Sequence, residues 1–391
     1  MAITVERKGG TPSMTTPASA PVSVRQFTIL VFLYTVGTTI LVIPAGLAAV
    51  AKQDAWIASL LGLLFNLAAV FFYLRFSRSF PDMTLAQYYE RVYGRWLGKL
   101  FTLSFVFFSF IGAATVLFYL GNFINTQVMP KTPIQAISIL FILIVAMGLR
   151  LGLEAIAKAG EILFPWIVLL FFILIACLLP QVEVHKLLPM FEADVSSLLK
   201  GAVSVTGTSA LPFIVFLMFY PAFVANRKKA GRGFVAGTIA GGLFIAAITF
   251  LSVAVLGADI SERQMYPSFS LAKRINIGNF FARVEILIAA IWFITVYFKI
   301  LFYLYGCVAG LAQLLGIGDY RALVLPMGMI LVVYSQVVYP NVVYAAEFDR
   351  TVWIPYILTY GLVIPIATWA VGRLRHRMRG KPTATSGDVG E

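Results

Sequence analysis

The sequence predicts an all-α integral membrane protein of about ten transmembrane helices, built as a five-plus-five inverted repeat. The chain of 391 residues is 60% hydrophobic and only 12% charged, with a mean hydropathy of +0.90. A water-soluble domain is roughly half apolar and a quarter charged, so lipid must cover much of this surface. The apolar residues gather into ten runs, and two of these runs carry a similar interruption at corresponding places of the two halves.

The ten apolar runs fill most of the chain. A bilayer-spanning helix needs roughly 20 residues, and each run reaches or approaches this length, although the fourth is short. The predicted spans are residues 25–50, 55–74, 99–126, 134–149, 159–180, 201–225, 233–257, 281–316, 321–340 and 351–372. We expect one transmembrane domain over 23–375, with halves 23–180 and 201–375. Residues 1–22, rich in Thr, Pro, Ser and Ala, are predicted to form a disordered cytoplasmic tail, and residues 376–391 a basic cytoplasmic tail.

The charges between the spans predict the orientation in the membrane. If the N-terminus is inside, the cytoplasmic segments are 1–25, 75–99, 150–161, 226–232, 316–321 and 373–391. They hold 20 of the 30 Lys and Arg residues but only 8 of the 17 Asp and Glu residues, which is the positive-inside bias. Both termini are therefore expected in the cytoplasm. The net charge of +13 reflects anchoring at the lipid bilayer rather than nucleic-acid binding.

Helices 1 and 6 share an interruption that predicts the inverted repeat. Helix 1 carries Gly37-Thr38-Thr39 followed by Pro44, and helix 6 carries Gly207-Thr208-Ser209 followed by Pro212. Gly and Pro weaken a helix interior, and a mid-membrane break is tolerated only where the freed backbone faces protein, water or ligand. Five helices is an odd number, so the second half enters from the opposite side of the membrane. We expect both helices to be discontinuous; the alternative is that small residues merely let helices pack closely.

Such a pair of breaks predicts a cradle for a free amino acid. The N-terminus of a half-helix suits a carboxylate, and freed carbonyl groups suit an ammonium group. The candidate ligand-binding residues at the breaks are Gly37, Thr38, Thr39, Thr206, Gly207, Thr208, Ser209 and Leu211. Each hydroxyl group among them could instead bond to a carbonyl of its own helix.

Lys299 is the clearest ionisable residue inside a predicted span. Burying its charge in the bilayer is costly, so a partner is expected, and Glu161 or Glu154 near the start of helix 5 is the predicted one. The alternative is that the amine loses its proton. In the functional interpretation, Lys299 or Lys158 takes the place of a coupling cation or relays a proton. In the structural interpretation, a static ion pair of Lys299 with Glu161 or Glu154 fixes helix 8 against helix 5.

Further residues are candidates for the wall of the same pocket. Ser109 and Ala113 share a face near the middle of helix 3, and Trp292 and Thr295 lie on the face of helix 8 that leads to Lys299. Trp353, near the end of a span, is expected to anchor at the membrane interface. The sequence contains no recognisable hydrolase, nucleotide-binding or metal motif, so we expect no catalytic residues, metal or cofactor.

Motifs along almost the whole chain, about 23–375, carry a resemblance to a family. They are Val24-Arg25-Gln26-Phe27, Gly37-Thr38-Thr39, Ile43-Pro44, Phe80-Pro81-Asp82-Met83-Thr84-Leu85, Tyr93-Gly94-Arg95-Trp96-Leu97-Gly98-Lys99, Arg150-Leu151-Gly152-Leu153-Glu154, Phe298-Lys299-Ile300, Gly310-Leu311-Ala312-Gln313 and Asp319-Tyr320-Arg321. In this order they resemble the endospore germination permeases, the B subunits of spore germinant receptors. The family often has Arg where this chain has Lys158.

The resemblance implies a LeuT-like fold of the amino acid–polyamine–organocation superfamily and a sensor in the inner membrane of a spore. It implies that the chain binds a nutrient germinant, commonly an amino acid, and signals to an A-type membrane subunit and a C-type lipoprotein subunit to trigger germination. A proton-coupled amino acid permease would have the same fold and cradle, and so remains an alternative. A membrane scaffold that binds no ligand is a third interpretation.

Overall fold

The computed structural model describes residues 22–274 and 284–379, and nearly all of them are helical. The first half contains α1 (Val24–Val36), α2 (Thr39–Ala51), α3 (Ala55–Ser77), α4 (Leu85–Tyr93), α5 (Arg95–Phe123), α6 (Ile134–Leu151) and α7 (Leu153–Leu178). The second half contains α8 (Val195–Ser209), α9 (Tyr220–Phe223), α10 (Arg227–Leu256), α11 (Ala258–Arg263), α12 (Pro267–Lys273), α13 (Glu285–Leu315), α14 (Arg321–Val337), α15 (Val342–Phe348), α16 (Ile354–Leu358) and α17 (Ile364–Arg379).

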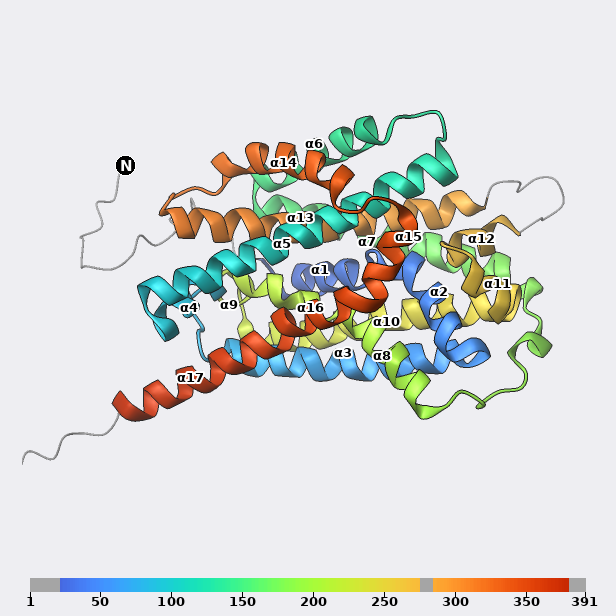
Figure 1. The fold of residues 1–391 in the computed structure, drawn as a ribbon, viewed down its shortest axis with the longest axis horizontal. Helices are drawn as coiled ribbons and strands as arrows, with labels where there is room; N and C mark the ends of the chain where they lie inside the picture. Colours follow the sequence, from blue (N-terminus) through green and yellow to red (C-terminus); the bar gives the residue numbers. More distant parts are fainter. Residues whose placement is uncertain (1–21, 275–283, 380–391) are drawn as a thin grey trace, which may run out of the picture.

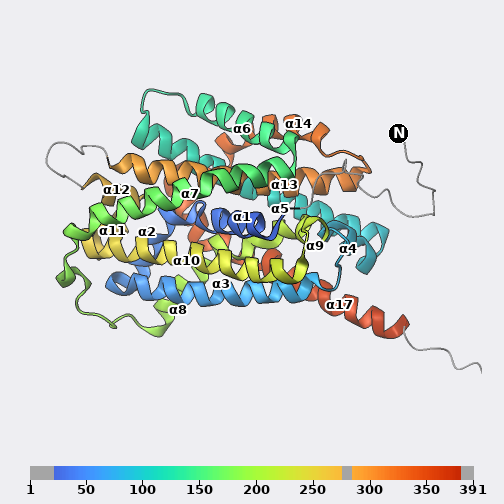
Figure 2. The same ribbon diagram turned by 180° about the vertical axis from the view of Figure 1, so that it is seen from behind.

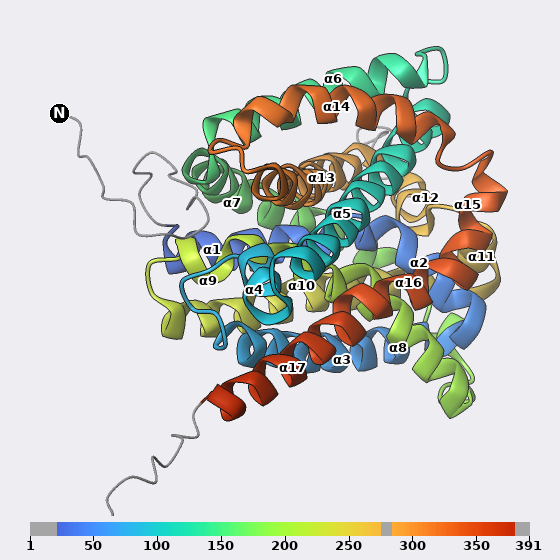
Figure 3. The ribbon, with the colours of Figure 1, turned by 60° about the vertical axis from the view of Figure 1, so that its left-hand side comes forward.

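The long helices run along the molecule and give it two distinct ends (Figures 1 and 2). α4 and the end of α17 lie at one end, called the α4 end here, and α11 and α12 lie at the other, the α11 end. At the centre, α1 packs against α7, α10 and α13, while α13 packs along α5. α3 packs against α8 and α10, and α6 packs against α14 at one side of the bundle (Figure 3).

The membrane-spanning helices agree with the predicted spans. Among the described residues, eight helical stretches are long and apolar enough to cross a membrane, and α1 and α14 are shorter apolar helices. One of the eight stretches, Thr39–Ser77, contains both α2 and α3. With α2 joined to α1 as one span and α3 counted as the next, the ten predicted runs coincide in order with crossing elements. The all-helical membrane class is therefore confirmed. The cytoplasmic placement of both termini stays a prediction.

Several helices extend beyond their apolar runs because polar residues can also begin a helix. α10 starts at Arg227, six residues before the predicted run, where the Asn226 side chain caps the helix by accepting from the Lys229 N–H at 3.0 Å. The last span begins at Val342 and contains two π-helical turns, Asp349–Trp353 and Thr359–Val363, on either side of α16. The predicted tails fall almost wholly on residues 1–21 and 380–391, which are outside the described residues.

The predicted discontinuity of helices 1 and 6 is confirmed. The α-helix of span 1 ends at Val36 and resumes at Thr39. The α-helix of span 6 ends at Ser209 and continues as a 3₁₀ helix over Leu211–Met218. Both breaks lie where a small residue and a hydroxyl residue precede a proline, as the sequence indicates. We call the region where the two breaks meet α13 the break site.

Candidate functional site

Lys299 of α13 lies at the break site and touches both breaks. Its side chain is 1% exposed, and its Nζ donates to the Thr208 carbonyl oxygen at 2.7 Å. The same atom lies 3.5 Å from the Thr39 Oγ1 and 5.4 Å from the centroid of the Tyr34 ring. The ammonium group therefore joins α2, α8 and α13 at one buried point.

The Thr208 carbonyl is available to Lys299 because of a proline. An α-helical carbonyl normally accepts from the N–H four residues later, and Pro212 has no N–H. The same rule holds at two other places. Pro44 frees the Ile40 carbonyl, which accepts from the Ser268 Oγ at 2.7 Å. Pro365 frees the Gly361 carbonyl, which accepts from the Tyr73 hydroxyl at 2.8 Å.

Side chains from other helices donate hydrogen bonds to the free carbonyls at the break in span 6. Besides Thr208, three of its carbonyl oxygens accept hydrogen bonds: Gly207 from the Trp353 Nε1 at 3.2 Å, Leu211 from the Tyr73 hydroxyl at 2.7 Å, and Pro212 from the Tyr34 hydroxyl at 3.3 Å. The four carbonyls form two adjacent pairs, 207–208 and 211–212, and they accept hydrogen bonds from side chains of α1, α3, α13 and the last span. Buried backbone groups need such partners, because an unpaired carbonyl in the bilayer is costly.

Tyr73→Phe is expected to lower the free energy of unfolding by about 2 kcal/mol, because the two buried carbonyls that share the single proton of the Tyr73 hydroxyl lose it. Thermal unfolding of the purified chain in detergent measures the change. Tyr344→Phe is the matched control, since Tyr344 is 51% exposed. Equal unfolding temperatures for the two variants would contradict the assigned role of the Tyr73 hydroxyl.

Most of the predicted hydroxyl ligands bond to their own helix. The hydroxyl groups of Thr206, Thr208, Ser209 and Thr295 donate to carbonyls three or four residues earlier, at 2.7 to 3.1 Å. These four hydroxyl groups therefore bond to carbonyls of their own helix, as the alternative interpretation expects. Thr39 differs, because its Oγ1 faces Lys299. Thr38 is buried and precedes α2 without a side-chain capping bond.

The predicted partners of Lys299 are wrong. Glu161 pairs with Arg25 at 3.3 Å and accepts from the Gln26 Nε2 at 3.1 Å, whereas Glu154 pairs with Lys158 at 2.8 Å on the surface of α7. Gln26 lies in the first turn of α1, and the break lies eleven residues further along, about 16 Å at 1.5 Å per residue. The Glu161 carboxylate therefore lies near one end of α1 and Lys299 near the other. Among the described residues, no carboxylate forms a salt bridge with Lys299.

Two glycines at the breaks allow side chains of neighbouring helices to pack closely against the backbone. A Cβ atom on Gly37 would lie 2.5 Å from the Lys299 Cδ and 2.9 Å from the Tyr34 carbonyl oxygen. A Cβ atom on Gly207 would lie 2.9 Å from the Ile354 Cδ1. The Tyr34 carbonyl oxygen belongs to the backbone and cannot move aside, so glycine is required at position 37, whereas a movement of the Ile354 side chain would relieve the contact at position 207.

The remaining predicted wall residues are buried, but they do not all reach the break site. Ser109 and Ala113 of α5 are fully buried against α13, and the Ser109 hydroxyl has no hydrogen-bond partner among the described residues. Trp292 packs against Phe123 with ring centroids 4.7 Å apart, near the α11 end of α5. It therefore lines a different part of the bundle from Lys299.

Three aromatic donors at the break of span 6, Trp353, Tyr34 and Tyr73, are not among the residues predicted for the site. Trp353 is 8% exposed and bonded to Gly207, so the expectation of an interfacial anchor is wrong for this residue. The rule that a proline frees the carbonyl four residues earlier indicates the Thr208 and Gly361 acceptors, but it does not indicate the Gly207, Leu211 and Pro212 carbonyls.

The comparisons with known proteins assign the chain to a family. The family model described as spore germination protein matches residues 21–343. The chain belongs to this spore germination family. It is 27% identical to spore germination protein KB of Bacillus subtilis over 82% of this chain and 86% of that protein. It is 28% identical to the putative spore germination protein YfkT of the same organism, over 81% of this chain and 87% of that protein.

Solved structures support the transporter fold of this spore germination permease. MHP1, a nucleobase-cation-symport-1 family transporter in a closed conformation with bromovinylhydantoin bound, superposes with a TM-score of 0.67 at 12% identity, covering 94% of this chain and 83% of that one. A Na⁺-coupled sialic acid symporter in a substrate-bound outward-open state gives 0.60 at 13% identity, covering 92% and 90%. The LeuT-like class and the multi-pass membrane character of the permease are confirmed.

Proposed function

We propose that this permease is the germinant-binding B subunit of a spore germinant receptor and that it binds a free amino acid at the break site. The observation that carries the proposal is the buried ammonium group of Lys299, which touches both helix breaks and has no carboxylate partner among the described residues. A buried charge without a counter-charge is costly, so the site favours an anionic group supplied by a ligand.

The chemistry of the site matches both charged groups of an amino acid. An ammonium group has three donors, and Lys299 has a single close oxygen acceptor, the Thr208 carbonyl at 2.7 Å, with the Thr39 hydroxyl oxygen at 3.5 Å. The N-terminus of α2 begins at Thr39 and offers N–H groups and a positive dipole beside Lys299. A ligand carboxylate would bind between Lys299 and this N-terminus. The ligand ammonium group would take the Thr208 carbonyl that Lys299 then releases.

Such an exchange would change how the helices are held together. In the structure, side chains of the protein itself bind the carbonyls of the span 6 break. A ligand that replaces Lys299 at Thr208 would loosen α13 from α8 and so favour a different arrangement of the bundle. We propose that an A-type membrane subunit and a C-type lipoprotein subunit in the spore inner membrane respond to this change and trigger germination, with both termini of the permease in the cytoplasm.

Binding and uptake of amino acids by the purified permease test the proposal. We expect saturable binding of at least one radiolabelled amino acid to the chain in proteoliposomes, with no accumulation inside the vesicles under an imposed proton gradient. Accumulation driven by the gradient would support the proton-coupled permease instead. Failure of all twenty standard amino acids to bind would contradict the proposed ligand class.

A further inference from the structure

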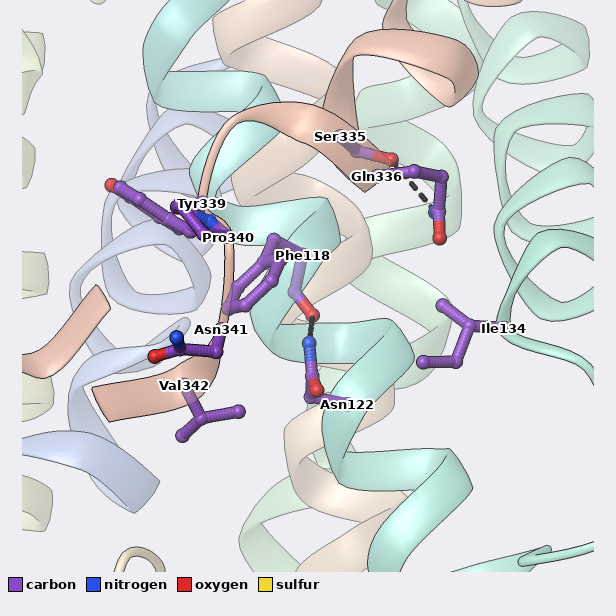
Figure 4. A pocket seen from close by; sticks show the side chains of 9 residues that line it. All are labelled: Phe118, Asn122, Ile134, Ser335, Gln336, Tyr339, Pro340, Asn341 and Val342. Carbon is purple, nitrogen blue, oxygen red and sulfur yellow. Dashed lines mark hydrogen bonds between the residues drawn. The ribbon is translucent and has the colours of Figure 1, made fainter. Parts of the chain in front are cut away.

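Asn66, in the middle of α3, carries a buried carboxamide without a partner among the described residues. The side chain is 0% exposed, and neither its Nδ2 nor its Oδ1 makes a hydrogen bond within that part of the chain. In the pocket at the ends of α5 and α14, by contrast, the Asn122 Nδ2 donates to the Phe118 carbonyl at 3.0 Å (Figure 4). Buried amides are normally paired, above all inside a membrane, so the Asn66 carboxamide points to a bound partner.

The packing of α3 on α8 places Asn66 beside the break in span 6. One turn before Asn66, a Cβ atom on Gly62 would lie 2.6 Å from the Val205 Cβ, so the two helices touch there. A step of four residues along each helix stays on the same face and brings Asn66 opposite Ser209, the last residue of α8. Two turns further along α3, Tyr73 donates to a carbonyl of the same break.

The carbonyl of Ser209 is one that the break deprives of its usual donors. In a 3₁₀ helix the donor would be the N–H of the residue three positions later, which is Pro212 and has none. In an α-helix the donor would be the Phe213 N–H, but this group donates to the Ala210 carbonyl at 3.0 Å. A carbonyl that needs an outside donor therefore lies on the turn that faces the unpaired amide of Asn66.

Water is the ligand that matches these groups. A primary amide beside a carbonyl offers N–H donors together with two acceptor oxygens. The donors disfavour a cation and the acceptors disfavour an anion, whereas water both donates and accepts. The close contact of α3 with α8 at Gly62 leaves a larger molecule no room unless the helices separate. Buried water commonly fills such places, where it pairs polar groups that the protein leaves unpaired.

We propose that Asn66 and the Ser209 carbonyl bind a buried water molecule that ties α3 to the break in span 6. The water accepts from the Asn66 Nδ2, donates one O–H to the Oδ1 of the same amide, and donates the other to the Ser209 carbonyl. These are about three hydrogen bonds, the usual number for a buried water. Lys299 holds the break from α13, and the water holds it from α3. The inference does not depend on the proposed function, because it requires no amino acid ligand.

A crystal structure of the purified full-length chain, at a resolution that shows ordered waters, tests the site directly. We expect a water within roughly 2.7–3.2 Å of both the Asn66 carboxamide and the Ser209 carbonyl oxygen. A direct hydrogen bond from the Asn66 Nδ2 to a protein acceptor would overturn the proposal. An ordered Asn66 side chain with no water beside it would overturn the proposal equally.

Asn66→Leu separates a water site from an amide that has no partner. Leucine has a similar size and no polar atoms, so it removes the bonds to the water and leaves the Ser209 carbonyl without a donor. We expect the unfolding temperature in detergent to fall by at least about 3 °C. An amide with no partner is itself destabilising, so its replacement by leucine would instead raise the unfolding temperature. A rise would therefore refute the site.

Asn66→Ser and Asn66→Ala are the matched pair for this measurement. Both shorten the side chain to a similar extent, but only serine keeps a hydroxyl group that can bind water. The serine variant should unfold at least about 3 °C above the alanine variant, although alanine is the better helix former. Equal unfolding temperatures, or a more stable alanine variant, would contradict the proposal. If a variant does not fold, the crystal structure of the unmodified chain still decides.

Amino acid binding keeps this inference apart from the proposed function. The water should be present without any ligand and also in Lys299→Met, because Lys299 contacts the break from the opposite side. Loss of the water in Lys299→Met would mean that Lys299 holds it, and would overturn its assignment to Asn66. A chain that shows the water and binds no amino acid would keep this inference and contradict the proposed function.

Discussion

Lys299→Met is expected to weaken amino acid binding by at least about 100-fold, which corresponds to about 2.7 kcal/mol. Methionine has a similar length and no charge, so the ligand carboxylate loses the ammonium group that offsets its burial. Equilibrium binding of the radiolabelled amino acid to the purified chain measures the effect, and size-exclusion chromatography confirms that the variant is folded.

Lys158→Met is the control for this result. Lys158 is also a candidate from the sequence, but it lies on the surface of α7 with its side chain 63% exposed and paired with Glu154 at i,i+4. Exposed pairs of this kind contribute only about 0.3–0.5 kcal/mol, so binding should remain within about twofold. If Lys158→Met lost binding and Lys299→Met kept it, the site would have to be moved to α7.

Gly37→Ala is expected to give the largest change in stability among the glycines of span 1. Its new methyl group would lie 2.5 Å from the Lys299 Cδ and 2.9 Å from the Tyr34 carbonyl oxygen. Overpacking of this kind costs about 1–3 kcal/mol, and displacement of Lys299 should also weaken ligand binding. Thermal unfolding in detergent and the same binding assay measure the two effects.

Gly46→Ala tests whether the effect comes from the break site. Gly46 lies in α2, and an added Cβ atom would meet no other atom within 4 Å. Alanine is favoured over glycine in a helix by about 0.5–1 kcal/mol, so this variant should be as stable as the unmodified chain or slightly more stable. A fall in unfolding temperature of the same size in both variants would mean that the close contact at Gly37 is unimportant.

The spans and the two breaks could be predicted because their causes are local in the sequence. Lipid requires a long apolar run for each crossing, and Gly and Pro disturb a helix wherever they stand. Span boundaries are predicted less accurately, because a helix such as α10 begins at Arg227, directly after the capping residue Asn226, which lies outside the apolar run. Hydropathy does not register a capping residue.

The partners at the break site could not be predicted from the same signals. Lys299 is expected from the sequence to need a counter-charge, and the predicted partner is Glu161 or Glu154 near the start of helix 5. The structure instead gives Lys299 a backbone carbonyl, whose availability depends on Pro212 in another helix. Which helix supplies the donor for each freed carbonyl depends on the packing of the whole bundle. The sequence indicates that Thr208 needs a donor, but it does not indicate that the donor is Lys299.

The hydrogen bonds to the carbonyls at the break of span 6 form late in the synthesis of the chain. Its carbonyls at Gly207 and Thr208 receive their donors from Trp353 and Lys299, which are 146 and 91 residues later in the chain. During synthesis at roughly 5–20 residues per second, the segment leaves the ribosome several seconds before either donor exists. Until then, water, lipid headgroups or the insertion machinery must donate hydrogen bonds to these carbonyls. Biogenesis of span 6 is thus completed only when the last helix of the protein enters the membrane.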